Sequence, residues 1–135
     1  MNKLLRNAFV AVLAMVGTSV YAQTVVTFLP NETKGTTDAN TTPDKMEKGG
    51  ITIESTDAAF NANGNKHYRF YQNSKTTITS TIGNITKVEF TCATEGKKHG
   101  SNGFEGEGYT STEDKKHGTW TGNAATIEFT AKYQV

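Results

Sequence analysis

The sequence contains one cysteine and two prolines in 135 residues, and its 14 basic residues nearly balance its 13 acidic ones. The single thiol, Cys92, excludes an internal disulfide, so packing and hydrogen bonds alone must hold the folded chain together. The balanced charge gives no basic surface for nucleic acid or for an anionic membrane. These shortages exclude a disulfide scaffold and an electrostatic binder, and nucleic acid is not an expected partner.

The sequence also lacks an apolar run long enough to cross a membrane. Its longest uninterrupted apolar stretch, AFVAVLAMV at residues 8–16, has nine residues, whereas a membrane-spanning helix needs about 20. The stretch follows Lys3 and Arg6 and precedes small residues that end at Ala22. A basic start, a short apolar run and a small-residue exit are typical of a secretory signal peptide, and a buried core helix is the alternative.

Cleavage after Ala22 predicts a mature chain of residues 23–135, a length that suits one domain with one core. The first mature residue, Gln23, is not the cysteine that a lipoprotein signal requires, so lipid anchoring is not expected. We therefore predict a signal peptide at residues 1–22, no membrane span, and a secreted or periplasmic protein.

Helical spacing of apolar residues is missing after the predicted cleavage site, and strict alternation takes its place. Val88, Phe90 and Cys92 share one face of ITKVEFTC, and Ile127 and Phe129 alternate with polar residues near the C-terminus. Alternation rich in Thr, Val, Ile and aromatic residues predicts half-buried strands. The predicted strands are 24–29, 51–55, 67–71, 75–80, 85–93, 107–111, 118–121 and 124–131. Many short strands between turns predict an all-β fold, a single antiparallel β-sandwich of jelly-roll type.

The polar segment 31–48 has almost no large apolar residues. We predict a long surface connection there, with one helical turn after Pro43. Cys92 falls on the inward face of its strand, which predicts a buried and unreactive thiol.

Four stretches occur in an order that resembles a known module: Arg69-Phe70-Tyr71, the Thr-rich 76–79, 85–91 (ITKVEFT) and 118–131 (GTWTGNAATIEFTA). The run 68–135 is similar to a β-sandwich module of secreted proteins from Gram-negative gut anaerobes. The resemblance implies a β-sandwich that is often attached to larger surface proteins and has no assigned catalytic residues. It also implies carbohydrate or surface binding, by analogy of fold.

The module continues beyond the point where this sequence ends, into a closing strand that would pair near residues 24–29. Without that strand an edge of the sheet would be unpaired and open to another chain. One hypothesis is therefore a shortened variant that self-associates or accepts a strand from a partner. The alternative is a C-terminally incomplete reading frame.

The motif KKHG occurs twice, in residues 95–100 (EGKKHG) and 113–118 (EDKKHG). If the strands around it form a meander, the two turns lie at opposite ends of strand 107–111, about 17 Å apart at about 3.4 Å per residue. Zinc needs its ligand nitrogens within about 2.1 Å, so His99 and His117 would not share an ion. Acidic residues beside the lysines are typical of solvated turns. We expect no metal site and no cofactor.

The sequence has no common catalytic motif. Glu105 and Glu107 form a carboxylate pair of the kind that a glycosidase uses, but a glycine-rich loop gives them no contrasting environments. The stretch NANGN at 61–65 lacks the carboxylates of a calcium loop. We predict no catalytic residues and no enzyme activity.

A strand at 67–71 would project His67, Arg69 and Tyr71 from one face. A guanidinium beside planar rings can stack on a sugar and donate to its hydroxyls, and Trp120 could add a platform. These four residues are the predicted ligand-binding residues.

Packing explains the same residues differently. Arg69 could pair across the sheet with Glu89 or Glu54, and Trp120 could belong to the core. The function predicted from the sequence is an exported, non-catalytic β-sandwich that binds a carbohydrate or a cell-surface partner. The alternative is an assembly or adhesion subunit that pairs through an unclosed sheet edge.

Overall fold

The computed structural model describes residues 9–15, 23–36, 42–61, 67–93 and 100–135. The first sheet contains β1 (Phe9–Met15), β2 (Thr24–Phe28), β7 (Asn84–Thr91), β9 (Tyr109–Ser111) and β10 (His117–Ala124). The second contains β3 (Thr42–Lys48), β4 (Ile51–Ala59), β5 (Arg69–Phe70), β6 (Lys75–Ser80), β8 (Phe104–Glu105) and β11 (Thr126–Ala131). A 3-10 turn, Ser101–Gly103, precedes β8.

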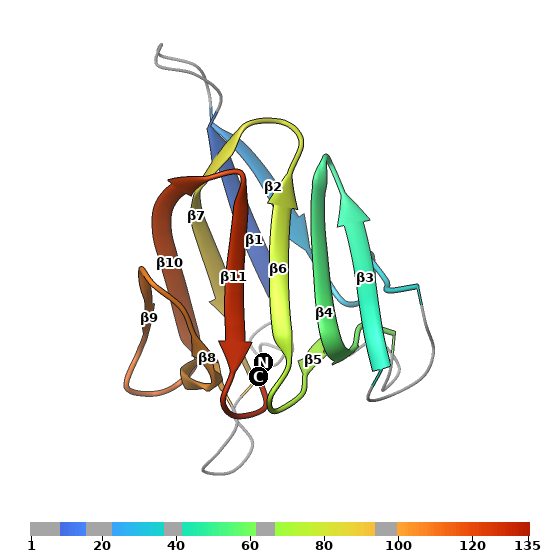
Figure 1. The fold of residues 1–135 in the computed structure, drawn as a ribbon, viewed down its shortest axis with the longest axis vertical. Helices are drawn as coiled ribbons and strands as arrows, with labels where there is room; N and C mark the ends of the chain where they lie inside the picture. The colour runs from blue at the N-terminus through green and yellow to red at the C-terminus, as the bar shows by residue number, and fades with distance from the viewer. Residues whose placement is uncertain (1–8, 16–22, 37–41, 62–66, 94–99) are drawn as a thin grey trace, which may run out of the picture.

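Both sheets are antiparallel throughout the described chain. The strand order is β2-β1-β7-β10-β9 in the first sheet and β3-β4-β6-β11-β8 in the second, where β5 also pairs with β4 (Figure 1). The prediction of an all-β, antiparallel fold is confirmed.

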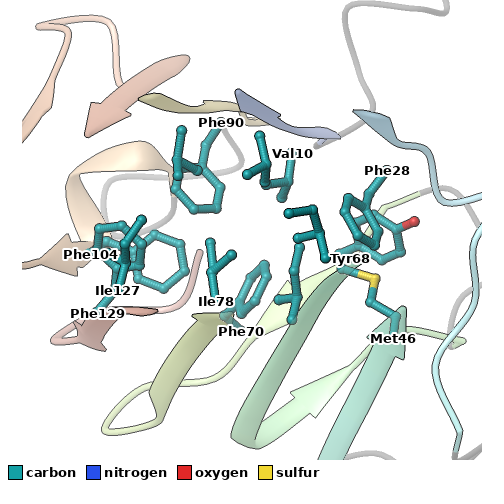
Figure 2. Close-up of a cluster of buried hydrophobic side chains, with 14 of the residues drawn as sticks. Val10, Phe28, Met46, Tyr68, Phe70, Ile78, Phe90, Phe104, Ile127 and Phe129 are labelled. Atoms are coloured by element: carbon teal, nitrogen blue, oxygen red, sulfur yellow. The ribbon is translucent and has the colours of Figure 1, made fainter. Parts of the chain in front are cut away.

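The two sheets face each other across one apolar core. Figure 2 shows Val10 and Phe90 from the first sheet opposite Phe70, Ile78 and Ile127 from the second. Phe90 crosses the interface, and its ring centroid lies 6.5 Å from that of Phe70. Edge-to-face rings at such distances add attraction beyond the area that they bury. The arrangement is sandwich-like, and the inward residues of each strand supply its core.

The apolar run near the N-terminus forms β1, a strand between β2 and β7. Val12 pairs with Val26 on one side and with Val88 on the other, and it is completely buried. The core helix considered for this run is therefore wrong, because the run is extended. The basic start and the exit of the predicted signal peptide, residues 1–8 and 16–22, lie outside the described residues, so the signal peptide stays a prediction.

The polar segment before residue 48 contains β3, which contradicts the surface connection and the helical turn predicted there. Pro43 is exposed on this edge strand, a position that tolerates a missing amide donor. The inward positions are Asp44 and Met46, with 2 % and 1 % of their surface exposed. An acidic residue at an inward position breaks the apolar alternation by which strands are recognised.

The predicted meander is also wrong, because β10 lies between β7 and β9. Trp120 pairs with Val88 on one side and with Tyr109 on the other. The backbone amide of Ser101, which directly follows the first KKHG motif, donates to the carbonyl of Lys115 in the second at 2.8 Å. The ends of the two motifs thus meet at one end of the sandwich. Lys97, Lys98 and His99 lie outside the described residues.

The last residue of the chain is tied to β5. The amides and carbonyls of Val135 and Phe70 exchange two hydrogen bonds of 2.9 Å. Lys132 donates its amide to the carbonyl of Gly103 at 2.8 Å. These bonds place the C-terminus at the end of the sandwich where β11 ends (Figure 1).

Candidate functional site

The strand β5 and the residues beside it carry the predicted ligand face. Tyr68 and Phe70 point inward, and 1 % of each is exposed. Phe60 meets both rings edge to face, at centroid distances of 5.7 and 5.2 Å. Arg69 alternates with these two residues and lies on the opposite side, together with His67. His67, Arg69 and Tyr71 are all half-buried.

Arg69 and His67 are hydrogen-bonded to each other. Arg69 donates from Nε to Nε2 of His67 at 3.1 Å. This bond requires an unprotonated Nε2, so the imidazole carries its proton on Nδ1. The bond holds the Arg69 guanidinium next to the imidazole of His67. Planar donors of this kind suit the hydroxyl groups of a sugar or the carboxylates of a protein.

Trp120 does not join this face. It lies on β10, in the other sheet, and only 7 % of its surface is exposed. Its indole fills space beside Gly108 and Gly122, where an added Cβ would lie 3.3 and 2.4 Å from indole atoms. The platform role predicted for Trp120 is therefore corrected to a core role.

The acidic pair considered for glycoside hydrolysis lies at the surface. Glu105, on β8, forms a 3.0 Å ion pair with Lys132, and both side chains are about half exposed. Glu107 is exposed in the turn that follows β8. Within the described residues no group of three or more His, Cys, Asp or Glu side chains is placed to hold a metal ion. The ranges that the structure describes also contain no helix long and apolar enough to cross a membrane.

Cys92 is buried, with 3 % of its surface exposed, and burial raises the pKa of its thiol to about 12. A buried thiol that stays protonated is unreactive at neutral pH.

The raised pKa of Cys92 has a consequence at high pH. The unfolded thiol ionises above its ordinary value of 9.0 while the folded thiol keeps its proton up to about 12. The free energy of unfolding should therefore fall between these values, by at most about 1.4 kcal/mol per pH unit from this group. Urea unfolding at pH values between about 8 and 11 measures the slope, and Cys92→Ala should flatten it. Equal slopes in the two proteins would contradict the burial of the thiol.

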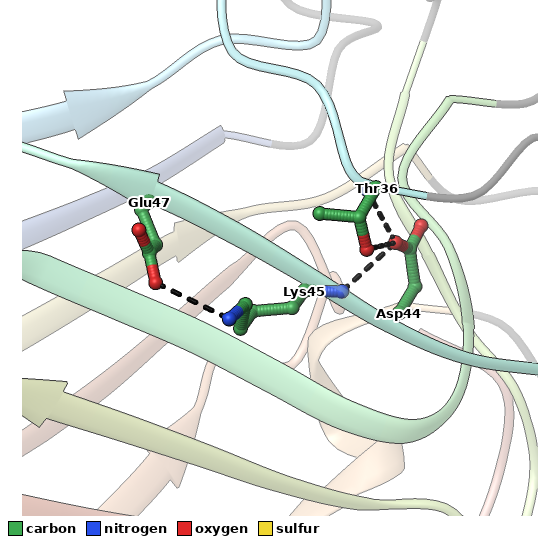
Figure 3. Close-up of polar contacts among 4 residues, drawn as sticks. All are labelled: Thr36, Asp44, Lys45 and Glu47. Carbon is green, nitrogen blue, oxygen red and sulfur yellow. Dashed lines mark hydrogen bonds and ion pairs between the residues drawn. The ribbon is translucent and has the colours of Figure 1, made fainter.

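Asp44, on the edge strand β3 of the second sheet, is a buried carboxylate that the sequence did not reveal. Asp44 Oδ1 accepts from the amides of Thr36 and Lys45, each at 2.8 Å (Figure 3). Its Oδ2 accepts from the amide of Phe60 at 3.0 Å. Asp44 thus ties the loop before β3 to β3 itself and to the end of β4. The same loop is held by Tyr68, whose hydroxyl donates to the carbonyl of Thr33 at 2.6 Å.

The second candidate site is the place between β2 and β7 that β1 occupies. It pairs with β2 over five residues and with β7 over seven, with a bulge between Leu13 and Ala14. In the described chain β2 has no other strand beside it, since it is the outer strand of this sheet. The gap expected beside residues 24–29 is therefore filled by residues 9–15.

No protein-family model, no curated protein and no solved structure matches the chain. The resemblance of residues 68–135 to a secreted β-sandwich module accordingly stays a prediction that rests on its motifs. The outward side chains of β5 and the strand pairing around β1 are the observations from which a function can be inferred.

Proposed function

We propose that the protein is an exported, non-catalytic β-sandwich of jelly-roll type that binds a carbohydrate or a cell-surface partner. The observation that carries this proposal is the outer face of β5. Its inward aromatic residues are locked in the core, so the backbone beneath His67, Arg69 and Tyr71 is rigid. A rigid strand that orients a guanidinium and two rings loses little entropy when a ligand binds.

Replacing Arg69 by alanine tests this proposal. We expect the affinity for a surface glycan, found by glycan array and measured by affinity gel electrophoresis, to fall about tenfold, because hydrogen bonds from a charged donor are lost. Lys75→Ala is the matched control, since Lys75 begins β6, the next strand along the chain, and pairs with Glu128 at 3.3 Å. Unchanged binding by Arg69→Ala would contradict the assignment of this face. Release of reducing sugar ends, lost in Glu105→Gln, would contradict the non-catalytic part.

An assembly subunit is the second candidate function, and the sheet order favours it. The strand that completes the first sheet is the segment with the features of a cleavable export signal. An exported subunit without it should elute with a strand-donating partner in size-exclusion chromatography. A free monomer with a sharp cooperative unfolding transition would contradict this candidate.

A further inference from the structure

The strand β1 is the only partner of β2 within the described part of the first sheet, and it also completes one side of β7. Its residues run antiparallel to both neighbours. Because each neighbour lies antiparallel to β1, β2 and β7 are parallel to each other. Direct pairing of β2 with β7 would therefore need a new register and a different hydrogen-bond pattern.

The position of β1 is apolar on its inward side. Val10 pairs with Phe28 and Phe90, and Val12 pairs with Val26 and Val88. All six side chains are buried, with between 0 and 6 % of their surface exposed. A segment in this position must therefore be extended and must carry uncharged, apolar side chains at the positions of Val10 and Val12.

Loss of β1 would leave β2 without a strand partner in the described chain, held by the packing of Val26 and Phe28 in the core. Outside the strand pairing, Lys48 donates from Nζ to the carbonyl of Thr27 at 2.7 Å, and Lys48 also forms a 3.6 Å ion pair with Glu32. The ion pair joins side chains that are 39 % and 54 % exposed, so it contributes little. The buried side chains of Val26, Phe28, Val88 and Phe90 would then face a gap one strand wide. Unpaired backbone groups beside buried apolar residues favour the binding of another strand.

We propose that the gap between β2 and β7 is a strand-acceptor site, which an extended segment of a different polypeptide enters once residues 1–22 have been removed on export. The proposal rests on the assembly function and specifies its site. The donated segment runs antiparallel to both β2 and β7 and places small apolar side chains at the positions of Val10 and Val12. A different chain is the favoured donor because every described strand except β2 keeps a sheet partner after β1 is lost. A second copy would have to unpair one of them, or withdraw the buried Val26 and Phe28 of its own β2 from the core.

The acceptor site can be tested on the complete chain. A specific protease site placed within residues 16–22 allows the covalent link between β1 and the rest of the chain to be cut after folding. The cut protein is then incubated with an excess of a fluorescent peptide that contains residues 8–16 with lysines added outside the paired region. We expect the peptide to replace the original segment and to co-elute with the protein. The same peptide with Val12→Lys should bind at least tenfold more weakly, because its ammonium group would be buried without a partner. The peptide with Ala11→Ser is the matched control for solubility.

The outcomes test the acceptor site and the removal of residues 1–22 on export separately. Failure of the peptide to bind, or equal binding of the Val12→Lys peptide, would overturn the acceptor site. Oligomers of the cut protein that exclude the peptide would also overturn the proposal, because they would show a second copy in the gap. N-terminal sequencing of the exported protein tests the other step. A chain that begins at Gln23 supports the proposal, and retention of residues 1–22 would overturn opening of the gap on export while leaving the peptide result intact.

Discussion

Replacing Phe90 by alanine is expected to lower the free energy of unfolding by about 4 kcal/mol. Only 2 % of Phe90 is exposed, and its ring lies at the centre of the aromatic core. Its centroid is 5.0 Å from that of Phe104 and 5.6 Å from that of Phe129. The substitution removes the apolar contacts of the ring and leaves a cavity between two sheets whose strands cannot easily move together. Urea unfolding gives the magnitude.

The control for Phe90→Ala is Val25→Thr, which keeps a branched side chain at a position that is 56 % exposed. It should change the free energy of unfolding by no more than about 0.5 kcal/mol. If Phe90→Ala cost as little as Val25→Thr, the two sheets would not be packed through this ring.

Replacing Asp44 by alanine is expected to lower the free energy of unfolding by about 3 kcal/mol. The carboxylate accepts from three backbone amides, and alanine leaves those donors without this acceptor in a buried site. Loss of acceptors for buried amides costs more than the loss of an exposed hydrogen bond. Thermal and urea unfolding should agree on the size of the effect.

Asp44→Asn provides a graded control. One oxygen of the amide can still accept from Thr36 and Lys45, whereas its NH2 group cannot accept from the amide of Phe60. The cost should therefore lie between zero and that of alanine. Gly35→Ala gives an independent check, because an added Cβ would collide with the Asp44 carboxylate. If Asp44→Ala and Gly35→Ala were each as stable as the unchanged protein, the arrangement of this loop would be contradicted.

The strands with clear alternation could be predicted from the sequence because burial on one face imposes a period of two. The prediction of 75–80 coincides with β6, and that of 24–29 differs from β2 by one residue. Alternation also predicts Tyr68 and Phe70 on the side opposite His67 and Arg69. Those positions follow from local geometry alone.

The missed elements depend on contacts that are distant in the sequence. The strand β3 was unrecognisable because its inward Asp44 is satisfied by amides 8 and 16 residues away. The order β7-β10-β9 was missed because chain order does not decide which strands are neighbours. The sequence left Trp120 open between a platform and the core, because Gly118, two residues earlier on the same inward face, gives no apolar signal. Residues 9–15 meet the requirements of an export signal and of a buried strand equally well, since both require an uncharged apolar run.

Amide hydrogen exchange on β2 tests the strand-acceptor site most directly. Exchange is measured on the complete chain and again after residues 1–22 have been cut off and washed away. The protection of the β2 amides should fall at least tenfold when β1 leaves, because β1 is the only strand paired with β2 in the described chain. The amides of β6, which lies between β4 and β11 in the second sheet, should keep most of their protection. Addition of the peptide of residues 8–16 should restore the protection of β2. Unchanged protection of β2 after the removal of β1 would contradict the acceptor site.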